Sequence, residues 1–242
     1  MKALLRWALL IVCAGVALQL FFIARIVLMI AVDPQSTAFQ RSEAWRLATT
    51  KELRWRAQWV DYERLPDNLK RAIIASEDGS FVNHDGVDWE ALEKAWQKNA
   101  RAQAQATRRA PSARAPAKAP KVVGGSTITQ QLAKNLFLSG ERTLLRKGQE
   151  FILTFALETV LSKRRILEIY LNSVEWGEGV FGAEAAAQHY FRKPAARLSA
   201  YEAARLAVML PRPKYFERVA QSGYLASRAA TIVARMGDAE LP

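Results

Sequence analysis

The stretch that decides the fold runs from Ala72 to Trp89 and reads AIIASEDGSFVNHDGVDW. It begins inside an apolar run, ends that run in two neighbouring carboxylates, Glu77 and Asp78, and then turns at a glycine. Apolar residues recur at helical spacing upstream, so we expect a helix that begins at Pro66 and ends at these acids. A carboxylate that closes an apolar helix is partly desolvated, which raises its pKa toward the range of a general base.

The N-terminus contains an apolar segment, Trp7 to Val32, in which Gln19 and Arg25 are the only strongly polar side chains. A helix of about 20 apolar residues crosses the hydrocarbon core of a bilayer, so this segment is long enough to span it. It is longer than the apolar core of a secretory signal and lacks a good cleavage site, so we expect an uncleaved anchor. Lys2 and Arg6 precede the span, which places the N-terminus in the cytoplasm and the rest of the chain across the membrane.

The formal net charge of +12 raises the question of nucleic-acid binding. Most of the excess lies in the anchor region and in an Ala/Pro-rich insert, a distribution that suits an anionic membrane surface better than a DNA groove. These basic residues are Lys2, Arg6, Arg25, Arg101, Arg108, Arg109, Arg114, Lys118 and Lys121. We therefore expect no nucleic-acid partner. The single cysteine, Cys13, lies in the anchor, so an intramolecular disulfide is excluded.

Composition divides the chain into an anchor (residues 1–33), a connector (34–60) and a folded domain (61–242). The connector interleaves Trp and Arg, and two readings stay open: a helix packed on the domain, or an element at headgroup depth in the membrane interface. Inside the domain, residues 100–121 consist mainly of Ala, Pro, Arg and Gln with no large apolar side chain to bury, so we expect a disordered basic insert. From residue 127 onward apolar residues recur at helical spacing, which predicts a mainly α fold.

A glycine pair followed by Ser126 and Thr127 opens one of these helices. Thr127 and Gln130 have the spacing of a capping box, and the glycines let the backbone approach a ligand closely. Gln131 and Asn135 are one helical turn apart and share a face, with a lysine between them. We favour a binding surface over a merely solvated polar face.

A second polar cluster lies in the segment ERTLLRKGQE, residues 141–150. Arg146 and Lys147 precede Glu150 by four and three positions, so this carboxylate is placed among cations. Such pairs also occur on ordinary helices. The helical turns that follow are nearly all apolar, however, and a cationic cluster at the start of a buried helix can bind a diphosphate. Glu77 and Glu150 differ in environment, the pattern expected of two carboxylates with separate roles.

These residues resemble the signature motifs of the peptidoglycan glycosyltransferases, family 51, in the order of that family. The motifs are Glu77-Asp78-Gly79-Ser80-Phe81 with His84 and Gly86, Gly125 to Gln131 with Lys134-Asn135, Arg146-Lys147-x-x-Glu150, Lys163 to Asn172 with Phe181 to Ala187, and Leu198 to Leu210. They cover most of residues 60–216, and only a short tail follows, so a monofunctional member is expected. The insert between the first two motifs departs from the family pattern.

The resemblance implies a mainly α, lysozyme-like glycosyltransferase domain with a membrane-associated smaller lobe, preceded by a single transmembrane helix. It implies polymerisation of lipid II into glycan strands, with inversion at the anomeric carbon and release of undecaprenyl diphosphate, in cell-wall biosynthesis. Lipid II, the growing strand and membrane lipids are the expected partners, and other cell-wall synthesis and division proteins are further candidates. The expected location is the bacterial inner membrane, single-pass, with the catalytic domain on the periplasmic side.

The same resemblance assigns roles to single residues. Glu77 is the general base, and Glu150 helps to hold the leaving diphosphate, alone or through a divalent metal such as Mg²⁺ or Mn²⁺. No organic cofactor is expected. Lys134 and Arg142 match diphosphate-binding positions. The other residues expected to line the cleft are Ser126, Gln131, Asn135 and Lys147.

Two rival functions remain open at this point. A lytic enzyme on the same scaffold would cut glycan, but it must protonate a leaving sugar oxygen and therefore needs an acid. The lysines and arginines of this chain favour synthesis. A non-catalytic anchored scaffold would bind cell-wall precursor without turnover, and the presence of both Glu77 and Glu150 argues against it.

Overall fold

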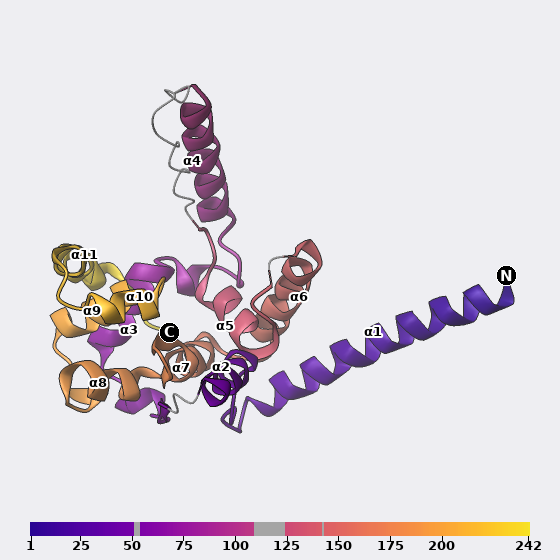
Figure 1. Cartoon of the computed structure of the whole chain (residues 1–242), viewed down its shortest axis with the longest axis horizontal. Coiled ribbons are helices and arrows are strands. Elements are labelled where there is room, and N and C mark those ends of the chain that lie inside the picture. Colours follow the sequence, from indigo (N-terminus) through magenta and orange to yellow (C-terminus); the bar gives the residue numbers. More distant parts are fainter. Residues whose placement is uncertain (51–53, 109–123, 142) are drawn as a thin grey trace.

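The structure is a computed structural model that describes residues 1–50, 54–108, 124–141 and 143–242. Helices dominate it, which confirms the mainly α prediction (Figure 1). The helices are α1 (Lys2–Leu28), α2 (Ala38–Thr49), α3 (Asp67–Glu77), α4 (Trp89–Arg108), α5 (Ile128–Phe137), α6 (Leu144–Val160), α7 (Lys163–Ser173), α8 (Ala183–Phe191), α9 (Ala200–Met209), α10 (Pro213–Arg218) and α11 (Gly223–Arg235). Short 3₁₀ turns lie at Tyr62–Arg64, Phe81–Asn83, Ala195–Arg197 and Met236–Asp238.

A small sheet, not expected from the sequence, joins the end of the connector to the segment after α7. Its strands are β1 (Arg56–Ala57), β2 (Glu175–Gly177) and β3 (Val180–Phe181), in the order β1-β3-β2. Strand β3 pairs parallel with β1 and antiparallel with β2. Gly179 permits the close approach: its φ is +70°, and a Cβ there would lie 1.8 Å from the carbonyl oxygen of Arg54. Strands this short carry no readable alternation, so their sequence signal is weak.

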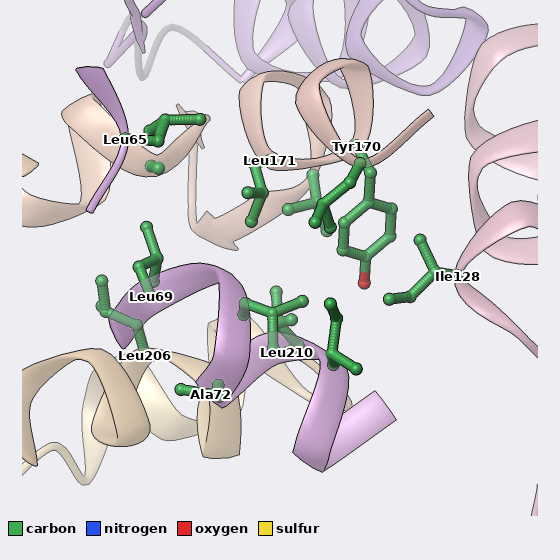
Figure 2. Close-up of a cluster of buried hydrophobic side chains, with 14 of the residues drawn as sticks. Leu65, Leu69, Ala72, Ile128, Tyr170, Leu171, Leu206 and Leu210 are labelled. Carbon is green, nitrogen blue, oxygen red and sulfur yellow. The ribbon is translucent and has the colours of Figure 1, made fainter. Parts of the chain in front are cut away.

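The hydrophobic core lies where α3 packs against α9 and α11 and where α5 packs against α6 and α7. Figure 2 shows side chains from α3, α5, α7 and α9 meeting in this core, with the ring of Tyr170 directed toward Ile128. The labelled residues are Leu65, Leu69, Ala72, Ile128, Tyr170, Leu171, Leu206 and Leu210, all of them buried. Each fully buried aliphatic side chain of this kind stabilises the fold by about 1.5–3 kcal/mol. The core thus fixes α3, which carries Glu77, relative to α5 and α7.

Local signals mark the helix ends as the sequence indicated. Thr127 accepts a hydrogen bond from the backbone N–H of Gln130, whose side chain accepts in turn from the N–H of Thr127. This confirms the capping box at the start of α5. The helix predicted to begin at Pro66 and to end at Glu77 and Asp78 is also present, as α3, with Pro66 as its N-cap and Glu77 as its last residue.

The apolar N-terminal helix α1 is the one helix among the described residues that is long and apolar enough to cross a membrane. Most of it stands away from the domain (Figure 1), but its last turns belong to the core. Ile26 is fully buried, and the ring of Phe22 packs edge-on against Phe137 of α5 with 5.3 Å between centroids. The amides of Gln19 and Gln149 exchange hydrogen bonds of 2.8 and 3.0 Å, which attach α1 to α6. The anchor is therefore not separated from the domain at residue 33.

The connector contains α2, and this helix packs on the domain, which confirms the first of the two interpretations. Leu47 is buried, and the buried carboxylate of Glu43 accepts hydrogen bonds from Arg46 and from Lys214 of α10. Trp45, in contrast, is 75% exposed, so the outer face of the same helix remains open to a membrane interface.

The expectation that residues 100–121 are disordered is wrong for 100–108, because α4 continues to Arg108. The reason is local: the segment is rich in Ala, Gln and Arg, all good helix formers, and the first proline comes at Pro111. Residues 109–121 lie outside the described part of the chain. Helix α4 projects from the body of the domain (Figure 1).

Candidate active site

The two acids that end α3 have different tasks. Asp78 is buried, and its Oδ2 accepts a 2.9 Å hydrogen bond from the backbone N–H of Ile128, the first residue of α5. Its Oδ1 lies 2.8 Å from Nε2 of His84. Because the Nδ1 of His84 accepts from the backbone N–H of Gly86, its Nε2 carries the proton and donates to Asp78. Asp78 therefore joins the end of α3 to the start of α5, and His84 is structural.

The turn after α3 is locked against α5 and α6. The hydroxyl of Thr127 donates a 2.6 Å hydrogen bond to the carbonyl of Gly86. Gly86 has φ +87°, and a Cβ at this position would lie 2.7 Å from Cγ2 of Thr154 and 2.8 Å from Cγ of Glu158. Only glycine fits both the backbone conformation and the space. The first and second motifs are thereby held as one rigid unit.

Glu77, the other acid, faces a cavity of about 370 Å³. Its Oε2 accepts a 3.0 Å hydrogen bond from Nε2 of Gln131 on α5. Burial raises the pKa of Glu77, and the hydrogen bonds from Gln131 and Ser76 oppose that rise. A carboxylate with a raised pKa that faces open space can act as a general base. This confirms the expected desolvation of Glu77.

The cavity at Glu77 is lined by three segments: the end of α3 with the glycine that follows, the start of α4, and the loop before α5. The loop that opens α5 contributes Ser126 to the lining. The cavity is also lined by Lys94 and Lys98, one turn apart on α4. These two lysines were not among the site residues predicted from the sequence; their spacing on one helical face was the available signal.

Glu150 lies in a separate ion cluster on α6. Its carboxylate is buried, at 5% side-chain exposure, and accepts a 2.8 Å hydrogen bond from Arg146 and a shorter one from Lys147. Both contacts were expected from the spacing. In the described part of the chain, the buried Nε of Arg146 has no hydrogen-bond partner. The cluster therefore offers more donors than its one carboxylate uses, which suits an anion.

Two further predicted site residues lie on α5, which packs against α6. Lys134 is exposed and Asn135 partly buried near the C-terminal end of α5, which packs against α6. Arg142 lies outside the described residues, so its expected place stays a prediction. Among the described residues, hydrogen bonds connect Glu77 with Gln131 and Glu150 with Lys147, but none connects the two groups.

Comparison with known proteins gives a family match over most of the chain. The family model of the transglycosylases matches residues 46–237. A biosynthetic peptidoglycan transglycosylase of Burkholderia thailandensis is 54% identical over 230 residues, which cover 95% of this chain and 84% of that protein. Proteins of the same name from Burkholderia orbicola and Burkholderia ambifaria are 54% and 53% identical, each with 95% of this chain and 87% of the relative covered.

The domain of this family is lysozyme-like, so the expected fold class is confirmed together with the helical architecture and the N-terminal apolar helix. The match begins inside α2 and ends after α11, and it thus contains every motif on which the resemblance was based. The chain belongs to the transglycosylase family.

Proposed function

We propose that this chain is a peptidoglycan glycosyltransferase that polymerises lipid II into glycan strands, with inversion at the anomeric carbon and release of undecaprenyl diphosphate. The observation that carries the proposal is Glu77, a partly buried carboxylate with a raised pKa that faces a cavity and is held by Gln131. Family membership and the names of the relatives support the reaction class.

In the proposed reaction Glu77 takes the proton of the 4-hydroxyl of the acceptor GlcNAc. The hydroxyl oxygen then forms a bond to the anomeric carbon of the donor MurNAc while the bond to the diphosphate oxygen breaks on the opposite face. The electron pair leaves with the diphosphate, so the configuration inverts. A sugar hydroxyl is a poor nucleophile without a base, and such a base contributes about 10²–10⁴-fold in rate.

The leaving group departs as an anion, so cations suffice and no proton donor is required. Arg146 and Lys147, both held by Glu150, supply charge at the start of α6. We assign diphosphate contacts to Lys147, to Lys134 on the neighbouring helix and to Arg142. Glu150 then acts mainly by ordering the two cations that contact it, and its loss would disperse them.

The side chains around Glu150 determine whether this site can bind a divalent metal by itself. Both oxygens of Glu150 are engaged by cations, and no group of three His, Cys, Asp or Glu side chains suited to a metal occurs among the described residues. These residues do not form a metal site of their own. Mg²⁺ or Mn²⁺ would therefore arrive with the substrate, because Mg²⁺ in such sites takes most ligands from phosphate and water.

The cellular placement follows from α1. One apolar helix near the N-terminus, preceded by basic residues, supports a single-pass anchor in the bacterial inner membrane with the domain on the periplasmic side. On α6, next to the contact with α1, Leu144 and Leu145 are 92% and 87% exposed. Apolar side chains exposed to this extent beside a membrane helix fit contact with lipid, so α6 is the candidate for the membrane-associated lobe.

One assay tests the proposal against its rivals. The full chain is purified in detergent and incubated with labelled lipid II; polymer supports synthesis, cleavage of added glycan supports a lytic enzyme, and binding without turnover supports a scaffold. We expect Glu77→Gln to abolish polymerisation while lipid II still binds, because only the proton-accepting group is lost. Substantial turnover by Glu77→Gln would remove Glu77 from the base role.

A further inference from the structure

A chain of hydrogen bonds leads from the core to Glu77. Tyr170 of α7 is fully buried, and its ring points across the core toward α5 (Figure 2). Its hydroxyl donates a 2.9 Å hydrogen bond to Oε1 of Gln131. The Nε2 of the same amide donates the 3.0 Å hydrogen bond to Oε2 of Glu77. Gln131 is 39 positions from Tyr170 and 54 from Glu77, so tertiary packing brings the three side chains together.

We propose that Tyr170 is a positioning residue for the reaction: its hydroxyl holds the Gln131 amide with the nitrogen toward Glu77 and so keeps that carboxylate ready to accept a proton. The inference rests on the proposed role of Glu77 as the base. Tyr170 itself does not line the cavity at Glu77.

The orientation of the amide follows from the donors and acceptors available. A Gln side chain can lie with either its oxygen or its nitrogen toward Glu77. With the oxygen toward Glu77, two acceptors would face each other while the carboxylate is ionised. The hydroxyl hydrogen of Tyr170 would also lose its acceptor in a fully buried place, which is unfavourable. Burial and the charges of Glu77 and Asp78 raise the pKa of Tyr170 well above its ordinary value, so the hydroxyl remains a donor.

The direction in which Tyr170 changes the pKa of Glu77 follows from the groups around this carboxylate. Its neighbours are Asp78 and Gln131, with Asp88, Lys94 and Lys98 across the cavity. Burial raises the pKa of Glu77, and the hydrogen bond from Gln131 lowers it. Without the Tyr170 hydroxyl the amide is free to turn, the donated hydrogen bond weakens, and the pKa of Glu77 rises further. Because the base must be ionised, the acidic limb of the pH–rate profile then moves to higher pH.

The test is the pH dependence of kcat/KM for Tyr170→Phe, a change that keeps the buried ring. We expect the acidic limb of Tyr170→Phe to lie about one pH unit higher than that of the unchanged protein. At pH values below the midpoints of both limbs the variant should then be about tenfold slower, and at pH values above both midpoints the two rates should be similar. Tyr190→Phe is the matched control, since the Tyr190 hydroxyl donates a 2.7 Å hydrogen bond to the carbonyl of Trp176, away from Glu77. The control should leave the limb in place. A parallel loss of rate at every pH in Tyr170→Phe would indicate only a structural role and overturn the inference.

A second variant shows whether Tyr170 acts through the amide. Gln131→Leu removes the donor to Glu77 directly and should move the acidic limb in the same direction, even if Tyr170→Phe does not fold. Adding Tyr170→Phe to Gln131→Leu should cause no further shift, whereas additive shifts would contradict the relay. If Glu77→Gln is inactive and neither variant shifts the limb, only this inference fails. If Glu77→Gln retains turnover, the proposed base and this inference both fail.

Discussion

Replacing Gly86 by alanine should destabilise the protein through a clash that can be located to single atoms. Gly86 has φ +87°, and the new Cβ would lie 2.7 Å from Cγ2 of Thr154 and 2.8 Å from Cγ of Glu158. A left-handed backbone costs a non-glycine residue about 1–2 kcal/mol, and overpacking in a close-packed site about 1–3 kcal/mol more. We therefore expect Gly86→Ala to lower the free energy of unfolding by about 3 kcal/mol, or Tm by about 6–12 °C for a domain of this size.

The measurement is thermal unfolding of the full chain in detergent, followed by far-UV circular dichroism. Gly79→Ala is the matched control: Gly79 lies in the same motif, but a Cβ there would meet no atom within 4 Å. A further variant, Gly86→Ala with Thr154→Ser, removes the methyl group that the new Cβ would meet and keeps the Thr154 hydroxyl, which donates to the carbonyl of Glu150. It should recover part of the loss. Equal Tm values for Gly86→Ala and Gly79→Ala would refute the steric argument.

Two further predictions concern charged groups. Lys147→Ala should lower kcat/KM with lipid II by about 10–100-fold, because a charge-assisted contact to the leaving diphosphate is typically worth about 1.5–3 kcal/mol; Lys193→Ala, which removes another half-exposed lysine paired with a glutamate, should have little effect. Unchanged kinetics in Lys147→Ala would exclude that contact. Burial raises the pKa of Glu175 to about 7, so this carboxylate destabilises the fold increasingly as pH rises from its unfolded value of about 4.5 toward 7. Glu175→Gln should therefore gain stability relative to the unchanged protein at pH 8 but not at pH 4, measured by urea unfolding, and an equal difference at both values would contradict the argument.

Features that depend on near neighbours in the chain were determined by the sequence alone. The apolar run of α1, the helical periodicity from residue 127 onward and the capping box at Thr127 each arise within a few turns of one segment. The spacing of Arg146, Lys147 and Glu150 likewise predicted the ion cluster on α6, because residues three and four positions apart share a helical face. The helical state of residues 100–108 was also encoded locally, because these residues are good helix formers. The prediction of disorder was made for residues 100–121 as a whole, whose composition is dominated by the proline-rich part.

Contacts between distant segments were decided only by the tertiary structure. The burial of Ile26 at the end of α1 depends on the surface of α5 and its neighbours, so an anchor that looked separable is partly core. Nothing in the sequence near Glu77 indicates that the amide of Gln131 reaches it or that Tyr170 holds that amide. A hydrogen bond is short and directional, and whether it forms depends on how α3, α5 and α7 pack, which helical periodicity does not specify. The sequence thus identified the candidate site residues, and packing decided which of them contact one another.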